Sequence, residues 1–129
     1  MSPGPGTTIG EMPATHLFAG VAVTDFPAAL RWYEALFGRP PDMLPMEGEA
    51  VWYVTSSGSV YVTAKPAQAG GALLTIAVSN LDEHASALVA RGLSLDQQEA
   101  HSSAPRHLTI TDPDGNFIKF FADPGNSAG

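Results

Sequence analysis

The chain has 129 residues and a mass of 13.5 kDa, which suits one domain on the usual scale of roughly 100–200 residues per domain. Hydrophobic residues make up 44% of it and charged residues 15%, so it can build a core and wholesale disorder is excluded. Thirteen acidic and six basic residues give a formal net charge of −7. We expect no nucleic-acid partner, because an acidic surface repels phosphate.

The chain contains no cysteine, which excludes disulfides, zinc fingers, thiol nucleophiles and iron–sulfur ligation. No apolar run approaches the roughly 18 residues that span a bilayer. The first residues lack the basic start and the apolar stretch of a signal peptide. These features predict a cytoplasmic protein without a membrane partner.

Proline and glycine are frequent at both ends, so we expect tails over residues 1–14 and 124–129 and one folded domain over 15–123. The domain opens with a short apolar run, Leu17–Val23, which is typical of a buried strand. Asp25 then supplies a capping oxygen for a helix over 26–37, which ends at Gly38. Two runs rich in Val, Tyr and Thr predict a hairpin, with strands over Ala50–Thr55 and Ser59–Lys65.

The same order returns in the second half. A strand is predicted over Leu73–Val78, followed by a helix that begins after Ser79-Asn80 and ends at Gly92. A weak strand near Leu93–Gln97 and a loop over Glu99–Pro105 are expected next. Two further strands are predicted, Arg106–Thr111 and Asn116–Ala122, joined by the sequence Asp-Pro-Asp-Gly at 112–115, which favours a type I turn.

The two halves form an internal repeat. The run Val-Ala-Val-Thr-Asp-Phe at 21–26 aligns with Ile-Ala-Val-Ser-Asn-Leu at 76–81, at an offset of 55 residues. Self-similarity on this scale indicates one supersecondary unit used twice. The prediction is an α+β fold of two βαβββ modules, over about 15–66 and 71–123, whose sheets curl around a cavity. Such a cavity forms where two modules pair, within one chain or between two chains.

Residues 15–123 resemble the vicinal oxygen chelate superfamily, which includes glyoxalase I, extradiol dioxygenases and bleomycin resistance proteins. The resemblance is carried by Leu36-Phe37-Gly38 after Trp32-Tyr33, by Leu81-Asp82 with Ala90-Arg91-Gly92-Leu93, and by Asp112-Pro113-Asp114-Gly115-Asn116 before the last strand. It implies two modules whose sheets enclose a ligand cavity. It also implies a homodimer, which the open sheet edges of such modules favour as well.

Catalytic members of this superfamily hold a divalent metal on His and Glu side chains. The resemblance places those ligands at Phe18, Leu73 and Lys119 of this chain. None of the three offers the lone pair that a metal ligand needs, because a lysine ammonium is a donor only. The sequence therefore predicts no metal cofactor. His16 and His107 are the fallback ligands, whereas His84 is expected on a solvated helix surface and His101 in a loop.

Period-two alternation assigns faces to the strands. Phe117, Lys119 and Phe121 share one side of the last strand, and Ile118 and Phe120 share the other. The resemblance makes the sides that carry Phe18 and Lys119 the cavity sides. We expect an organic ligand to be held there by stacking and one hydrogen bond. The predicted ligand-binding residues are Phe18, Trp52, Tyr61, Phe117, Lys119 and Phe121.

Three functions follow. The favoured one is a metal-free protein, not an enzyme, that binds a small organic molecule such as an antibiotic or secondary metabolite, as resistance members of the superfamily do. The alternative is a divalent-metal lyase, isomerase or dioxygenase that uses displaced ligands such as His16 and His107. A third is a metal-free enzyme in which Lys119 acts as a base or electrostatic stabiliser.

Overall fold

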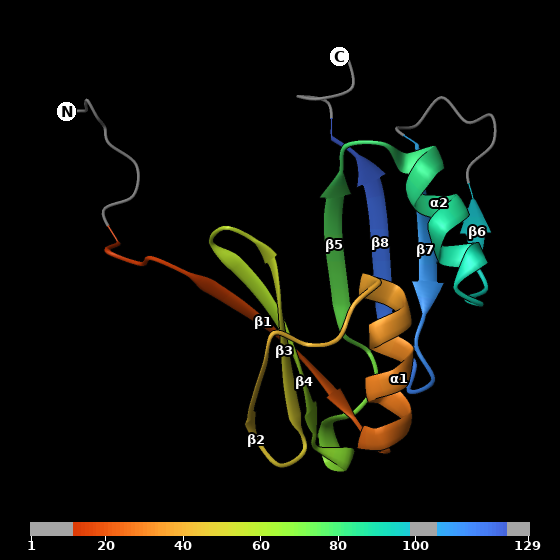
Figure 1. The fold of residues 1–129 in the computed structure, drawn as a ribbon. Helices are drawn as coiled ribbons and strands as arrows, with labels where there is room; N and C mark the ends of the chain where they lie inside the picture. The colour runs from red at the N-terminus through yellow and green to blue at the C-terminus, as the bar shows by residue number, and fades with distance from the viewer. Residues whose placement is uncertain (1–11, 99–105, 124–129) are drawn as a thin grey trace.

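The structure is a computed structural model, and it describes residues 12–98 and 106–123 (Figure 1). The predicted tail residues 1–11 and 124–129, and the loop residues 99–105 with His101, lie outside this described part. The described elements follow the order β-α-β-β-β twice, with a one-turn 3-10 helix between the repeats. Their bounds are β1 Leu17–Val23, α1 Phe26–Phe37, β2 Met43–Met46, β3 Glu49–Thr55, β4 Gly58–Ala64, η1 Pro66–Gln68, β5 Leu73–Val78, α2 Leu81–Ala90, β6 Gln97–Gln98, β7 His107–Thr111 and β8 Phe117–Ala122.

Each repeat forms its own four-stranded sheet with the same strand order, β1-β4-β3-β2 and β5-β8-β7-β6 (Figure 1). In both sheets the first strand is parallel to the last, and the other neighbours are antiparallel. The predicted α+β fold of two equivalent modules is therefore confirmed.

The first helix begins and ends as predicted. The Asp25 carboxylate accepts a hydrogen bond from the backbone N–H of Ala28 at 3.1 Å, and Gly38 ends the helix with a left-handed φ of 77°. The second helix begins at Leu81, where the Asn80 side chain accepts from the Glu83 N–H at 3.0 Å. Both modules thus use an Asp or Asn cap to turn the chain from strand to helix.

Two strands differ from the prediction. No residue pattern predicts β2, because its four exposed residues, Met43 to Met46, lack β-branched side chains and include Pro45. Proline is tolerated there because β2 is an edge strand. The weak strand expected near Leu93–Gln97 is instead the two-residue β6, Gln97–Gln98, displaced toward β7.

A single hydrophobic core joins the two modules. It contains side chains from both helices and from the side of each sheet that faces them. We call this side the core face and the opposite side the open face. The core-face residues buried on the strands are Val21, Val23, Ala50, Trp52, Val60, Val62, Leu108, Ile110, Ile118 and Phe120.

Polar contacts at the turn before β8 also join the modules. Asp112, which is buried, accepts hydrogen bonds from the Tyr33 hydroxyl at 2.6 Å and from the Asn116 side-chain amide at 2.8 Å. The same amide group donates to the Ala22 carbonyl at 3.1 Å, and its oxygen accepts from the Ala72 N–H at 3.0 Å. The Asn116 side chain is thus hydrogen-bonded to β1 of the first module and to the residue before β5 of the second. The turn therefore holds the two modules together.

The helices contact each other through one arginine. The Arg91 guanidinium, at the end of α2, donates to the carbonyls of Ala35 and Leu36 in the last turn of α1. This contact satisfies carbonyls that have no partner within the helix. None of the helices in the described part of the chain has the length and apolar character needed to cross a membrane.

Candidate ligand-binding faces

The open face of the first sheet is rich in aromatic and sulfur-containing side chains. The strand registers align Gly20, Tyr61, Val51 and Met43 in one row across the sheet. The neighbouring row contains Phe18, Ser59 and Tyr53. The Tyr53 hydroxyl donates to the Met43 sulfur at 3.2 Å, so the two rows are linked at the edge of the sheet.

Tyr61 lies across the bare backbone of Gly20. A Cβ atom added to Gly20 would be only 2.5 Å from Cζ of the Tyr61 ring, closer than two such atoms ever approach. Any other residue at position 20 would therefore displace the ring. The aromatic surface of this face depends on the missing side chain of Gly20.

His16 belongs to the same face. Its Nε2 atom is 2.7 Å from the hydroxyl of Ser59, which is buried, and its ring is tilted against the Phe18 ring with 4.6 Å between centroids. Phe18 itself is 53% exposed. The face thus presents an aromatic surface that no described side chain covers completely.

The open face of the second sheet has a different composition. Lys119 lies in a row between Thr75 on β5 and Thr109 on β7, with Phe117 and Phe121 on either side of it along β8. Lys119 and Phe117 are exposed, and Phe121 is half-buried. The predicted alternation is correct for this strand, because Ile118 and Phe120 are buried in the core.

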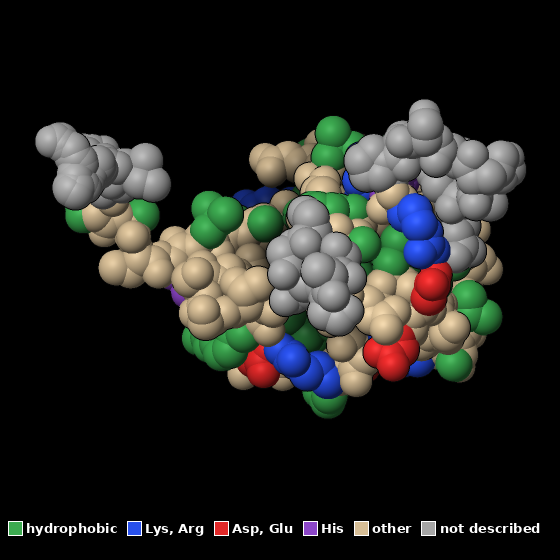
Figure 2. Space-filling model, turned by 90° about the horizontal axis from the view of Figure 1, so that it is seen from above, with side chains coloured by type: hydrophobic (Ala, Val, Ile, Leu, Met, Phe, Trp, Pro, Cys, Tyr) green, Lys and Arg blue, Asp and Glu red, His purple; other side chains and the backbone are tan. Residues whose placement is uncertain are grey.

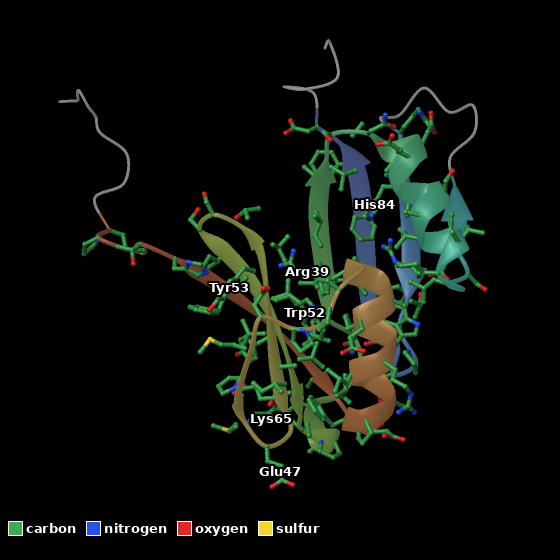
Figure 3. All side chains as sticks on the ribbon, viewed as in Figure 1. Arg39, Glu47, Trp52, Tyr53, Lys65 and His84 are labelled. Atoms are coloured by element: carbon green, nitrogen blue, oxygen red, sulfur yellow. The ribbon has the colours of Figure 1, made fainter. Side chains whose placement is uncertain are left out.

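Trp52, which is one of the predicted ligand-binding residues, is not part of either open face. It lies on the core face with 0% exposure, and its indole N–H donates to the Arg39 carbonyl at 3.0 Å. Its ring packs 5.2 Å from that of Phe37 on α1. Figure 3 shows Trp52 on the side of the sheet toward α1 and its neighbour Tyr53 on the other side. Trp52 is a core residue.

The sheets do not close around the predicted cavity. The space between them is a cavity of about 350 Å³, open to the outside. It is bounded by core-face side chains and by the edge of β5, and none of the six predicted ligand-binding residues lines it. Its apolar lining residues are Leu17, Ala19, Val54, Val60, Leu74, Ile76 and Ala77. The open faces of the two sheets therefore do not face each other within one chain. Seen from above, the surface carries hydrophobic side chains at several separate places (Figure 2).

His84 also differs from the prediction. Its ring is half-buried against Phe120, with 4.3 Å between centroids, rather than solvated on a helix surface. Its Nε2 atom is buried and has no hydrogen-bond partner in the described part of the chain. Burial, together with the positive charge of Arg91, lowers the pKa of His84 below its ordinary value of 6.5. His84 is thus a neutral packing residue (Figure 3).

The residues present do not fit the divalent metal that the superfamily implies. Phe18, Leu73 and Lys119 carry exposed side chains that offer no lone pair. Within residues 12–98 and 106–123, no three His, Asp or Glu side chains are grouped closely enough to hold a metal ion. The fallback ligands are His16, which directly precedes β1, and His107, which is the first residue of β7, and neither belongs to such a group.

Comparison with solved structures identifies the family. The fold matches a glyoxalase/bleomycin resistance protein from Catenulispora acidiphila with a TM-score of 0.81 and 41% sequence identity, over 86% of this chain and 100% of that one. A glyoxalase/bleomycin resistance protein from Albidiferax ferrireducens matches with a TM-score of 0.62 and 22% identity, over 85% and 98% of the two chains. TnmS3, an antibiotic binding protein from Streptomyces sp. CB03234, matches with a TM-score of 0.68 and 22% identity, over 87% and 98%.

No family sequence model and no curated protein sequence matches the chain. The two structural matches at 22% identity support the fold alone. The likeness at 41% identity covers the whole of the related chain, so this protein belongs to the glyoxalase/bleomycin resistance protein family.

Proposed function

We propose that this protein binds a small organic molecule on its open faces without a metal ion and without catalysing a reaction. The observation that carries this proposal is the replacement of all three metal-ligand positions by Phe18, Leu73 and Lys119. The aromatic Phe18 and the apolar Leu73 favour stacking and desolvation of a ligand over coordination, and the Lys119 ammonium cannot coordinate a metal. An antibiotic or another secondary metabolite with a planar apolar body has the chemistry that such a surface takes.

A second copy of the chain completes the site in this proposal. Each open face leaves large apolar side chains in water, with Leu73 at 78% exposure and Phe18 at 53%. Contiguous exposed apolar surface of this kind usually marks an interaction site. Pairing the first sheet of one copy with the second sheet of another would enclose a ligand between an aromatic face and a face that carries Lys119.

The test is a titration with N-phenyl-1-naphthylamine, a neutral aromatic dye whose fluorescence rises in apolar surroundings. The dye's own signal is preferable to tryptophan fluorescence, because Trp52 is buried in the core and does not touch the open face. We expect saturable binding, weakened about tenfold in Phe18→Ala and in Tyr61→Ala, since each removes an aromatic contact. Val89→Ala, an exposed position on α2, is the matched control and keeps the affinity of the unmodified protein.

Absence of saturable binding at micromolar protein would contradict the proposal. So would equal binding by the Phe18→Ala, Tyr61→Ala and Val89→Ala variants. Elemental analysis of the purified protein tests the metal-dependent alternative. If the protein contains a stoichiometric transition metal that is lost in His16→Ala and His107→Ala, the metal-dependent enzyme is favoured over the metal-free binding protein.

A further inference from the structure

Lys119 is an exposed cation on the open face of the second sheet, where its register neighbours are threonines and the residues along β8 on either side of it are phenylalanines. Arg39 and Arg106 form ion pairs with Asp42 and Asp82, and Arg91 donates to the carbonyls of α1. In the described part of the chain no acidic side chain forms an ion pair with Lys119. A protein with a net charge of −7 has many carboxylates, yet none of those described neutralises this ammonium group.

The internal repeat shows which residue of the first module is equivalent to Lys119. At the offset of the repeat, β1 aligns with β5, so that Gly20 corresponds to Thr75. Gly20 is the register partner of Tyr61, and Thr75 is the register partner of Lys119. Tyr61 in the first module and Lys119 in the second therefore occupy the same place on their sheets, one aromatic and one cationic.

The surroundings of Lys119 suit an anion on an apolar body. Thr75 and Thr109, the register partners on either side of it, carry hydroxyl groups that donate to oxygen, and Phe117 and Phe121 supply ring surface along β8. An ammonium group binds carboxylate, phenolate or sulfonate oxygen by charge-assisted hydrogen bonds. Lys119 is exposed in one chain, so this bond strengthens when a bound ligand and a second copy cover the face and exclude competing water.

We propose that the ligand of the open faces is a planar aromatic molecule with an acidic group, and that Lys119 is the counter-ion of that group. This inference rests on the proposed binding function and adds the chemical class of the ligand. Tyr61 and its neighbours hold the ring system, while Lys119 with its two threonines holds the anionic end.

The experiment compares two dyes that share one ring system. 8-Anilinonaphthalene-1-sulfonate is N-phenyl-1-naphthylamine with a sulfonate added, so the pair isolates the anionic group. In Lys119→Met the affinity for the sulfonate dye falls about tenfold, whereas the affinity for the neutral dye stays within about twofold. Lys119→Arg keeps the charge and retains most of the affinity for the sulfonate dye.

Arg31→Met is the matched control, because it removes one positive charge from an exposed position on α1, away from the open faces. It leaves both affinities unchanged, which separates a local ion pair from the effect of net charge. Added sodium chloride weakens binding of the sulfonate dye to the unmodified protein but not to Lys119→Met.

The failures of the two proposals are distinguishable. If both dyes bind and Lys119→Met weakens neither or weakens both equally, the anionic class is wrong and the binding function stands. A loss of sulfonate-dye binding in Arg31→Met as large as that in Lys119→Met also overturns the role of Lys119. If neither dye binds saturably, the binding function itself fails, and the ligand class fails with it.

Discussion

The two sheets are alike on the side that faces the helices and differ on the side that does not. On the core faces, Val60 and Val62 of the first module correspond to Ile118 and Phe120 of the second, and all four are buried. On the open faces the equivalent positions hold Tyr61 and Lys119. Packing therefore restricts one side to apolar side chains, whereas the other side can change its chemistry without changing the fold. In the proposed function, specificity for a ligand belongs to that second side.

The largest expected effect separates two neighbours on β3. Trp52→Ala removes a fully buried indole from the core, so we expect the free energy of unfolding to fall by about 3–5 kcal/mol. Tyr53→Ala removes a side chain that is 46% exposed on the open face, and we expect a change of at most about 1 kcal/mol. Urea denaturation followed by circular dichroism measures both values. Similar losses in the two variants would show that the two faces do not differ as described.

The next effect concerns the contact between modules. Asn116→Ala removes the partner of the Ala72 N–H and the Ala22 carbonyl and one donor to the buried Asp112. We expect a loss of about 2–3 kcal/mol, because buried polar groups lose their hydrogen bonds. Asn80→Ala, which removes only a helix cap, is the control and costs about 1 kcal/mol. A loss in Asn116→Ala no greater than the control's would mean that this turn does not hold the modules together.

The smallest of these effects depends on pH. Burial, reinforced by the hydrogen bond to Asp112 and that group's negative charge, raises the pKa of Tyr33 well above its ordinary value of about 10. In the unfolded chain Tyr33 ionises near pH 10, but in the folded chain it stays neutral, so stability falls as the pH rises above 10. Tyr33→Phe loses about 1–2 kcal/mol at neutral pH with the hydrogen bond, and this alkaline decline becomes shallower.

Unfolding by urea at several pH values between 8 and 11 measures the difference. Tyr53→Phe is the control, because that hydroxyl lies at the exposed edge of the first sheet. An alkaline decline of the same slope in Tyr33→Phe and in the unmodified protein would remove Tyr33 as its source.

Local patterns in the sequence predicted most of the fold. The helix over 26–37 could be predicted because its cap, its apolar spacing and its terminal glycine are local signals within one short segment. The alternation in β8 assigned Lys119 and Ile118 to opposite faces for the same reason. By contrast, β2 exists because β3 pairs with it, and its own residues carry no strand pattern.

The candidate site was less predictable. The side of the sheet on which Trp52 lies depends on the register of the hairpin, which contains an irregularity between Tyr53 and Thr55. The direction in which the open faces point depends on contacts between modules, such as those of Asn116 and Arg91, which join residues far apart in the sequence. No short-range pattern encodes such contacts, so the sequence alone left open whether the two modules enclose a cavity within one chain or between two.

Gly20 determines the shape of the aromatic open face of the first sheet. The Tyr61 ring lies flat only because nothing projects from the neighbouring strand beneath it. An alanine at position 20 would tilt the Tyr61 ring away from the sheet. The tilted ring would reduce the space for a ligand above this face, although residue 20 would not contact the ligand. Under the proposed function, a substitution at position 20 therefore changes the size of molecule that this face binds.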